Sequence, residues 1–91
     1  MVRDGDLVAI FNSIHRVMKV EKVLKERRLD FLLIPVPRSL ASDCGLAIRY
    51  AEADHQLISA VLAEVELLPE QLFRFSNGVF VQTGENFHLK T

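Results

Sequence analysis

The sequence predicts an α+β protein with the ferredoxin-like split βαββαβ arrangement: an antiparallel sheet with two helices on one face, plus a C-terminal hairpin strand. Strand-length apolar segments alternate with two segments of helical periodicity. The connection between the second and third strands is too short for a helical crossover, which the alternative, a small doubly wound parallel sheet, would need. The pair Asn77-Gly78 marks a tight hairpin near the C-terminus.

The first half of the chain contains two predicted strands and the longer helix. Residues 7–11 form an apolar run typical of a buried central strand. Ser13 can accept a hydrogen bond from the first free amides of a helix over residues 14–28. The apolar residues expected to face the core from this helix are Ile14, Val17, Met18 and Leu24, with Val20 beside them. Residues 31–34 form the second strand, and the prolines at 35 and 37 stop its pairing.

The second half supplies the other strands and the second helix. Residues 46–50 form the third strand, and Asp54 is the predicted cap of a helix. The apolar stripe of that helix is Leu57, Ile58, Val61, Leu62 and Val65. Residues 71–75 alternate like a half-buried strand, and residues 79–81 pair back after the hairpin turn. We expect one ferredoxin-like domain over residues 1–76, then a hairpin strand and tail over 77–91, frayed from residue 85.

Composition and charge exclude several classes of function. The chain has 91 residues, of which 49% are hydrophobic and 25% charged, as in a single soluble domain. The net charge is −1 with both signs interleaved, which argues against a nucleic-acid partner. No apolar segment reaches the length of a membrane span, and residues 1–6 lack the apolar core of a signal peptide. We therefore expect a cytoplasmic protein with no membrane partner.

Cys44, the lone cysteine, is the main candidate functional residue. It lies in the loop-like stretch Ser42-Asp43-Cys44-Gly45, whereas buried structural cysteines usually lie in apolar runs. Gly45 lets the backbone turn and exposes its neighbour. One cysteine excludes a disulfide framework and a cysteine-rich zinc site.

The sequence offers no motif for a metal or a cofactor. Its histidines, His15, His55 and His88, fall on different elements, and no phosphate-binding glycine loop is present. Cysteine and histidine occur together, but no third orienting group or oxyanion donor marks a hydrolase triad. We expect no cofactor.

The predicted strand order places the thiol beside a helix start. The first and second strands run parallel with the third between them, so the end of the first strand and the loop after the second share one sheet edge. The first helix begins there too, so we expect Cys44 to lie near Asn12, Ser13 and His15. A helix N-terminus and a protonated imidazole both lower the pKa of a thiol, and His15 could exchange protons with the sulfur.

Two charged residues flank the thiol in sequence and act in opposite directions. Arg38 would add positive charge or hold an anion. Asp43 disfavours the thiolate, unless it is only a turn former. The simpler interpretation of His15 and Arg38 is that they are solvated surface residues, and of Cys44 that it is incidental.

The loop and the strands around it resemble one known family. Residues 34–38 (Ile-Pro-Val-Pro-Arg), residues 42–45 and the strand at 46–50 resemble the selenium/sulfur carrier-like proteins, a bacterial family of small domains. Residues 12–15 resemble the polar turn, ending in histidine, that begins the family's first helix, and residues 20–25 the helix that follows. The resemblance covers roughly residues 7–75, without the hairpin beyond Asn77.

This resemblance implies a carrier protein rather than a stand-alone enzyme. Cys44 would hold sulfur or selenium as a persulfide or selenosulfide, taken from a donor protein and passed to an acceptor protein by exchange chemistry. His15 would support the thiolate, and the residues expected to bind around it are Ser13, Arg38, Asp43 and Gly45.

The alternative hypothesis is a non-catalytic interaction or regulatory module. Small domains of this fold class often pair through sheet edges, and fold alone does not set function. The strand after Asn77-Gly78 would then extend the sheet across a homodimer. This hypothesis predicts that Cys44→Ser leaves the biological role intact.

Overall fold

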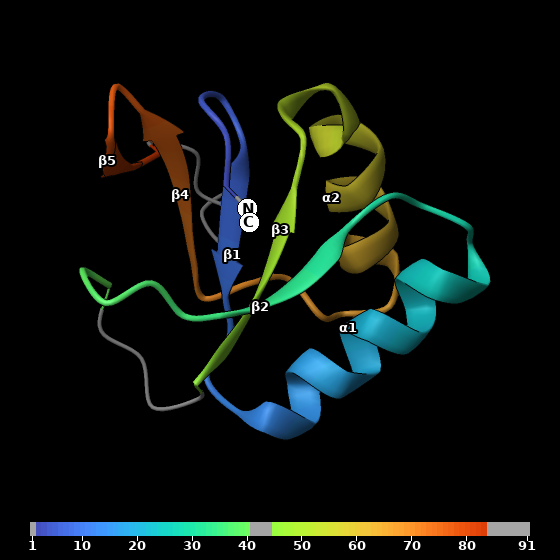
Figure 1. Cartoon of the computed structure of the whole chain (residues 1–91). Helices are drawn as coiled ribbons and strands as arrows, with labels where there is room; N and C mark the ends of the chain where they lie inside the picture. The colour runs from blue at the N-terminus through green and yellow to red at the C-terminus, as the bar shows by residue number, and fades with distance from the viewer. Residues whose placement is uncertain (1, 41–44, 84–91) are drawn as a thin grey trace.

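The computed structural model describes residues 2–40 and 45–83, which form five strands and two α-helices (Figure 1). In chain order the elements are β1 (Leu7–Ile10), α1 (Ile14–Glu26), β2 (Leu32–Pro35), β3 (Leu46–Tyr50), the 3₁₀ helix η1 (Glu52–Asp54), α2 (His55–Glu64), β4 (Gln71–Ser76) and β5 (Val79–Gln82). The strands form one sheet in the order β2-β3-β1-β4-β5, and every neighbouring pair is antiparallel. This is the predicted ferredoxin-like split arrangement, with β5 joined to the same sheet.

β1 is the central strand, and each of its faces belongs to a different hydrophobic core. Leu7 and Ala9 join the core beneath the helices, whereas Val8 and Ile10 join the core on the opposite face. All four are at most 2% exposed. Because side chains alternate along a strand, a one-residue slip would exchange the two faces, so burial on both sides fixes the register.

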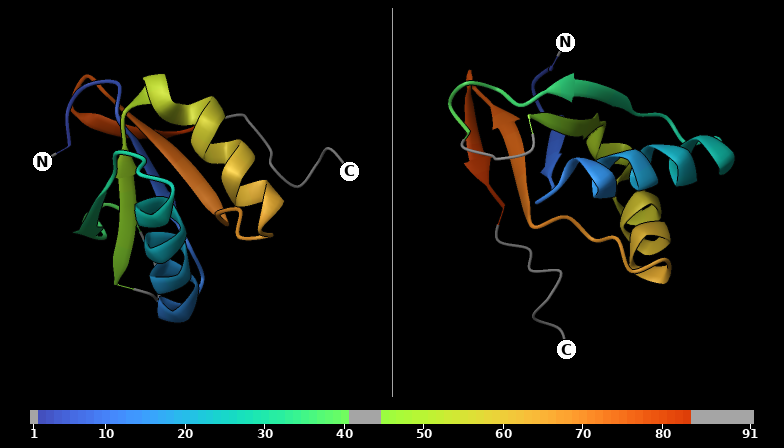
Figure 2. Two further views of the ribbon diagram at one scale, coloured as in Figure 1. Left: turned by 90° about the vertical axis from the view of Figure 1, so that its right-hand side faces the viewer. Right: turned by 90° about the horizontal axis from the view of Figure 1, so that it is seen from below.

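Both helices cover the same face of the sheet, as predicted (Figure 2). α1 contributes Val17, Val20 and Leu24 to the core beneath them, and α2 contributes Ile58, Val61 and Leu62. The sheet supplies Leu7, Ala9, Ile48, Tyr50 and Leu72 to the same core. The apolar stripe predicted for the second helix is therefore largely correct, except that Leu57 is 54% exposed.

The stripe predicted for the first helix was wrong at two positions. Ile14 and Met18 are 40% and 39% exposed, whereas Val20 is fully buried. At about 100° per residue, Val17, Val20 and Leu24 lie within about 60° of one another around the helix, and Ile14 and Met18 lie about 90° and about 130° from the middle of that group. The helix cannot turn both groups toward the same sheet, and the group of Val17, Val20 and Leu24 is the one that is buried.

Both helices end with a non-glycine residue in the left-handed conformation. Arg28 has φ 58° and Glu66 has φ 59°, each directly after its helix cap. The next amides donate back into the helix, Leu29 to the carbonyl of Leu24 at 3.0 Å and Leu67 to that of Leu62 at 2.8 Å. This is the Schellman pattern, which satisfies the last helical carbonyls. It ends α1 at Glu26, two residues before the predicted end.

Three local predictions concern the turns and caps. Asn77 and Gly78 have φ of 51° and 82°, which confirms the predicted tight hairpin between β4 and β5. Asp54 is the residue before α2, but its side chain makes no capping hydrogen bond, because η1 already supplies a turn there. Pro35 remains paired with Leu46, since β2 is an edge strand that tolerates proline. The predicted frayed tail from residue 85 lies outside the described residues.

Truncating α1 on its two sides should have different effects on stability. Leu24→Ala removes a fully buried side chain, and we expect it to lower the free energy of unfolding by about 2–5 kcal/mol. Met18→Ala, on the exposed side, should change it by no more than about 0.5 kcal/mol. Urea unfolding followed by circular dichroism measures both. Equal losses would contradict the packing described for α1.

Candidate functional site

The described residues of the predicted site lie at the end of the sheet where β1 and β2 finish and β3 begins. Ala47, near the start of β3, pairs with Ile10 on one side and with Ile34 on the other. β1 and β2 therefore run parallel with β3 between them, which confirms the predicted strand order. α1 starts from the same end of the sheet (Figure 1).

The start of α1 is held by Ser13. Its hydroxyl oxygen accepts a hydrogen bond from the backbone amide of Arg16 at 3.2 Å, which confirms the predicted helix cap. His15 lies in the first turn and is exposed. The free amides of this turn give the helix start a partial positive charge. An exposed imidazole and a positive helix end are therefore present at this edge.

Gly45 is the last residue of the connection between β2 and β3, directly before β3 begins at Leu46. Its carbonyl accepts a hydrogen bond from the amide of Val36 at 3.0 Å, directly beyond the last pair of the ladder. Its φ is +84°, in the left-handed region that favours glycine. A Cβ placed on it would meet none of the described residues within 4 Å, so they leave the space beside it open.

The remaining predicted site residues lie in the connection itself. Arg38 is exposed in the turn after Pro37, and the amide of Leu40 bonds back to the Pro37 carbonyl at 2.9 Å. Cys44 and Asp43 lie outside the described residues. The structure thus brings Ser13, His15 and Gly45 to one end of the sheet, and Val36, at the other described end of the connection between β2 and β3, lies there too.

An apolar groove of about 550 Å³ lies on the face of the sheet away from the helices. It is lined by Val2, Ile34, Pro35, Val36, Pro37, Phe75 and Phe80. One wall is the segment that leads from β2 toward Cys44, and the other holds Phe75 and Phe80, with ring centroids 4.8 Å apart. Its apolar lining offers hydrophobic contact without hydrogen-bonding groups to orient a polar ligand.

The groove was missed at the sequence level. In the sequence, Pro35 and Pro37 only indicate where the pairing of the second strand stops, and Phe75 and Phe80 lie on separate strands. Only the hairpin register, which pairs Phe75 with Phe80, puts the two rings on one face opposite the prolines. The sequence signals that could have indicated the groove are the two prolines at the end of the second strand and the aromatic residues that alternate along the fourth strand.

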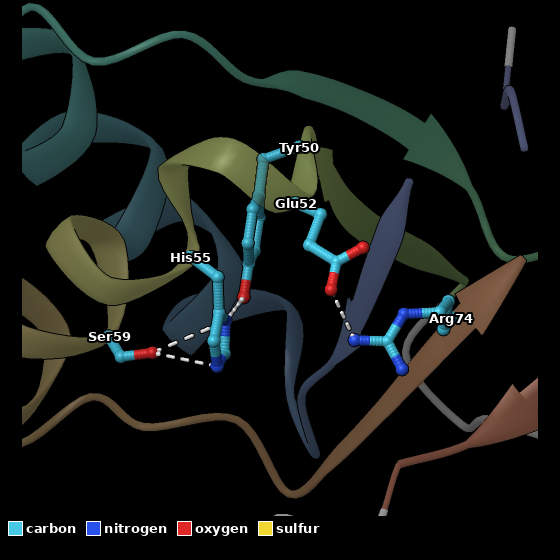
Figure 3. A network of polar contacts seen from close by, with 5 residues as sticks. All are labelled: Tyr50, Glu52, His55, Ser59 and Arg74. Carbon is cyan, nitrogen blue, oxygen red and sulfur yellow. Dashed lines mark hydrogen bonds and ion pairs between the residues drawn. The ribbon is translucent and has the colours of Figure 1, made fainter. Parts of the chain in front are cut away.

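A polar network lies at the opposite end of the sheet (Figure 3). Tyr50 is 2% exposed, and its hydroxyl lies 3.0 Å from Nδ1 of His55, with the two rings stacked at a centroid distance of 6.0 Å. The hydroxyl of Ser59 lies 3.4 Å from both ring nitrogens of His55. Beside them, Arg74 donates to the carboxylate of Glu52 at 2.6 Å.

This network is better explained as structural than as catalytic. A serine nucleophile needs its hydroxyl aligned with one ring nitrogen of the base, whereas Ser59 is equally distant from both. Tyr50 and His55 instead connect β3 to the start of α2, and Glu52 connects η1 to β4 through Arg74. Sequence reasoning placed Tyr50 and His55 on separate elements and did not pair them.

The described ranges, residues 2–40 and 45–83, lack two further kinds of feature, a metal site and a membrane-spanning helix. Within them, no three histidine, cysteine or acidic side chains are grouped so that they could hold a metal ion. Neither helix there is long and apolar enough to cross a membrane.

One protein family matches the chain. Residues 6–74 match the family described as "Putative Se/S carrier protein-like". The match runs from the start of β1 into β4, and so includes the Ser13 cap and the connection with Cys44. No curated protein and no solved structure matches the chain.

Removing the cap should weaken the helix start without affecting the rest of the fold. We expect Ser13→Ala to lower the free energy of unfolding by about 1 kcal/mol, because the amide of Arg16 loses its partner. The matched control is Ser39→Ala, at an exposed serine in the turn after β2, which should have almost no effect. Chemical unfolding of both variants makes the comparison. A Ser13→Ala variant as stable as the wild type would show that the cap contributes nothing.

Proposed function

Because the chain belongs to the Se/S carrier protein-like family, we propose that it carries sulfur or selenium on the thiol of Cys44. One observation carries this proposal: the family match spans the only cysteine of the chain, in the connection between β2 and β3. The strand order supports it, since this connection leaves and rejoins the sheet at the end where α1 begins. The partners are a donor protein and an acceptor protein, in the cytoplasm.

The proposed chemistry is thiol exchange at a sulfane sulfur. The thiolate of Cys44 attacks the outer sulfur of a persulfide on the donor protein. The sulfur–sulfur bond of the donor breaks, a new one forms at Cys44, and the donor cysteine leaves as a thiolate. The proton stays on the transferred sulfur, so charge and atoms balance and no separate oxidant is needed. Attack by an acceptor thiolate on the same sulfur returns Cys44 to its starting form. A selenosulfide would form and exchange in the same way.

The described residues at this edge fit the needs of a thiolate. A positive helix end lowers the pKa of a nearby thiol, and the Ser13-capped start of α1 is such an end. His15, exposed in the first turn, would exchange protons with the sulfur. Asp43 acts in the opposite direction, because a neighbouring carboxylate disfavours the thiolate.

Two other residues would serve the approach of a partner. The space beside Gly45, which none of the described residues fills, would allow the reacting residue of a donor or acceptor to reach the sulfur. Arg38, exposed in the turn after β2, would attract a negatively charged group that approaches the loop.

A second candidate function is supported by the outer edge of the sheet. β5 is the last strand, and its Val79 and Val81 are 57% and 52% exposed. An exposed apolar edge strand can pair with a strand of another chain. This favours an interaction module that forms a homodimer through β5, in which Cys44 has no chemical role.

Sulfur loading separates the two candidates. The purified protein is incubated with a cysteine desulfurase and cysteine, and its intact mass is measured before and after reduction with dithiothreitol. We expect wild type to gain sulfur that reduction removes, and Cys44→Ser to gain none. The matched control combines Cys44→Ser with Ser39→Cys, which places an exposed thiol in the nearby turn.

Each outcome has one meaning. Loading of wild type alone supports a carrier whose cysteine must stand at position 44. Equal loading of the Ser39→Cys control would mean that any exposed thiol accepts sulfur, and the site would lose its support. No loading of wild type would contradict the carrier and leave the interaction module.

A further inference from the structure

The charged residues are segregated between α1 and the segment that contains η1 and α2. Residues 16–28, which include most of α1 and its C-cap Arg27, contain six basic and two acidic residues, a net charge of +4. Residues 52–70, which include η1 and α2, contain five acidic residues and no lysine or arginine, a net charge of −5. The whole chain has a net charge of −1, so this separation is hidden in the composition.

The outer face of α1 combines positive charge with apolar side chains. We define this face by Ile14, Met18, Lys19 and Lys22, all exposed. Ile14 and Met18 are one turn apart, and Lys22 follows one turn later on the same line, with Lys19 beside it. The core does not use this face, because α1 packs through Val17, Val20 and Leu24.

The lysines of this face are unpaired within the described residues, whereas Arg16 of α1 and its C-cap Arg27 contact residues in and after α2. Arg27 pairs with Glu64 at 3.5 Å, and Arg16 donates to the carbonyl of Glu66 at 3.2 Å. Within the part of the chain that the structure describes, Lys19 and Lys22 make no ion pair and no side-chain hydrogen bond. Their charge is therefore not neutralised by the fold.

The outer face of α1 begins at the same end of the sheet as β3, the strand that follows Cys44 in the chain. Ile14 is the first residue of α1, which starts at the end of the sheet where Gly45 leads into β3. Figures 1 and 2 show the start of α1 at that end, away from the start of α2. A protein seated on the first two turns of α1 would thus lie at the end of the sheet where Gly45, the residue after Cys44, leads into β3.

We propose that the outer face of α1 is the docking surface for a partner protein with an acidic, partly apolar surface. The inference rests on the proposed function, because this partner is the protein that exchanges sulfur with Cys44. Protein interfaces combine an apolar centre with a polar rim, and complementary charge directs the encounter. The segment 52–70 stays negative even though Glu52 and Glu64 are paired with arginines, so it repels the same partner and favours its approach toward α1.

Two other occupants fit these observations less well. A nucleic acid needs several cations along its backbone, whereas this face offers two unpaired lysines next to Ile14 and Met18. A second copy of this chain would present its acidic residues, but part of that charge is already neutralised. Glu52 pairs with Arg74 at 2.6 Å, and Glu64 with Arg27 at 3.5 Å.

The test is the rate of sulfur loading of Cys44 by a cysteine desulfurase of the same organism, measured against carrier concentration and salt. The variant is K19E/K22E. The matched control is R3E/R28E, which changes the net charge equally at two exposed residues off the face. We expect K19E/K22E to lower kcat/KM for the carrier about tenfold, with kcat unchanged at saturation. The control should stay within about twofold of wild type, and only wild type and control should slow steeply with salt.

The outcomes separate docking from chemistry. If K19E/K22E loads sulfur like wild type, the docking surface is overturned and the carrier function stands. A fall in kcat alone would place the lysines in the chemistry of the thiol and would also overturn docking. If wild type takes up no sulfur, the carrier function fails and the inference fails with it. If sedimentation velocity shows a wild-type dimer that K19E/K22E dissolves, the occupant is a second copy.

Discussion

The antiparallel insertion of β3 between β1 and β2 is the pairing on which the rest of the structure depends. It runs from Leu7 opposite Tyr50 to Ile10 opposite Ala47 on one side, and ends with Pro35 opposite Leu46 on the other. With β3 in this place, β1 and β2 must be parallel, and α1 must cross one face of the sheet to connect them. The connection between β2 and β3 then falls at the end where α1 begins.

A partly buried ion pair reinforces this register. Asp6 is 6% exposed, and its Oδ2 accepts hydrogen bonds from Nε of Arg49 and from the amide of Arg3, each at 2.8 Å. Arg49 lies on β3, whereas Asp6 directly precedes β1. If the two strands slipped, the carboxylate would be left buried without its partner, which is costly. The hydrophobic alternation of β1 and this ion pair therefore select the same register.

Much of this arrangement follows from the order of elements, because the short stretch between the second and third strands allows only antiparallel pairing. The Asn77-Gly78 turn and the Ser13 cap were predictable because their chemistry is local. The buried face of α1 was not. Ile14 and Met18 are spaced as well as Val17, Val20 and Leu24, and the sheet decides between the two lines. The groove and the Tyr50–His55 contact also depend on tertiary packing, so the sequence did not predict them. For the candidate site, the sequence predicted the end of the sheet at which its described residues lie.

The strand order predicts that Cys44, in the connection between β2 and β3, lies beside the start of α1. Because Cys44 is the only cysteine, a nitroxide can be attached to it alone and its effect on each backbone amide measured by nuclear magnetic resonance. This position predicts strong paramagnetic broadening of the amides of Ser13, His15 and Arg16, and little at His55 and Ser59, at the opposite end of the sheet. Broadening at His55 and Ser59 with sharp signals at the start of α1 would contradict it.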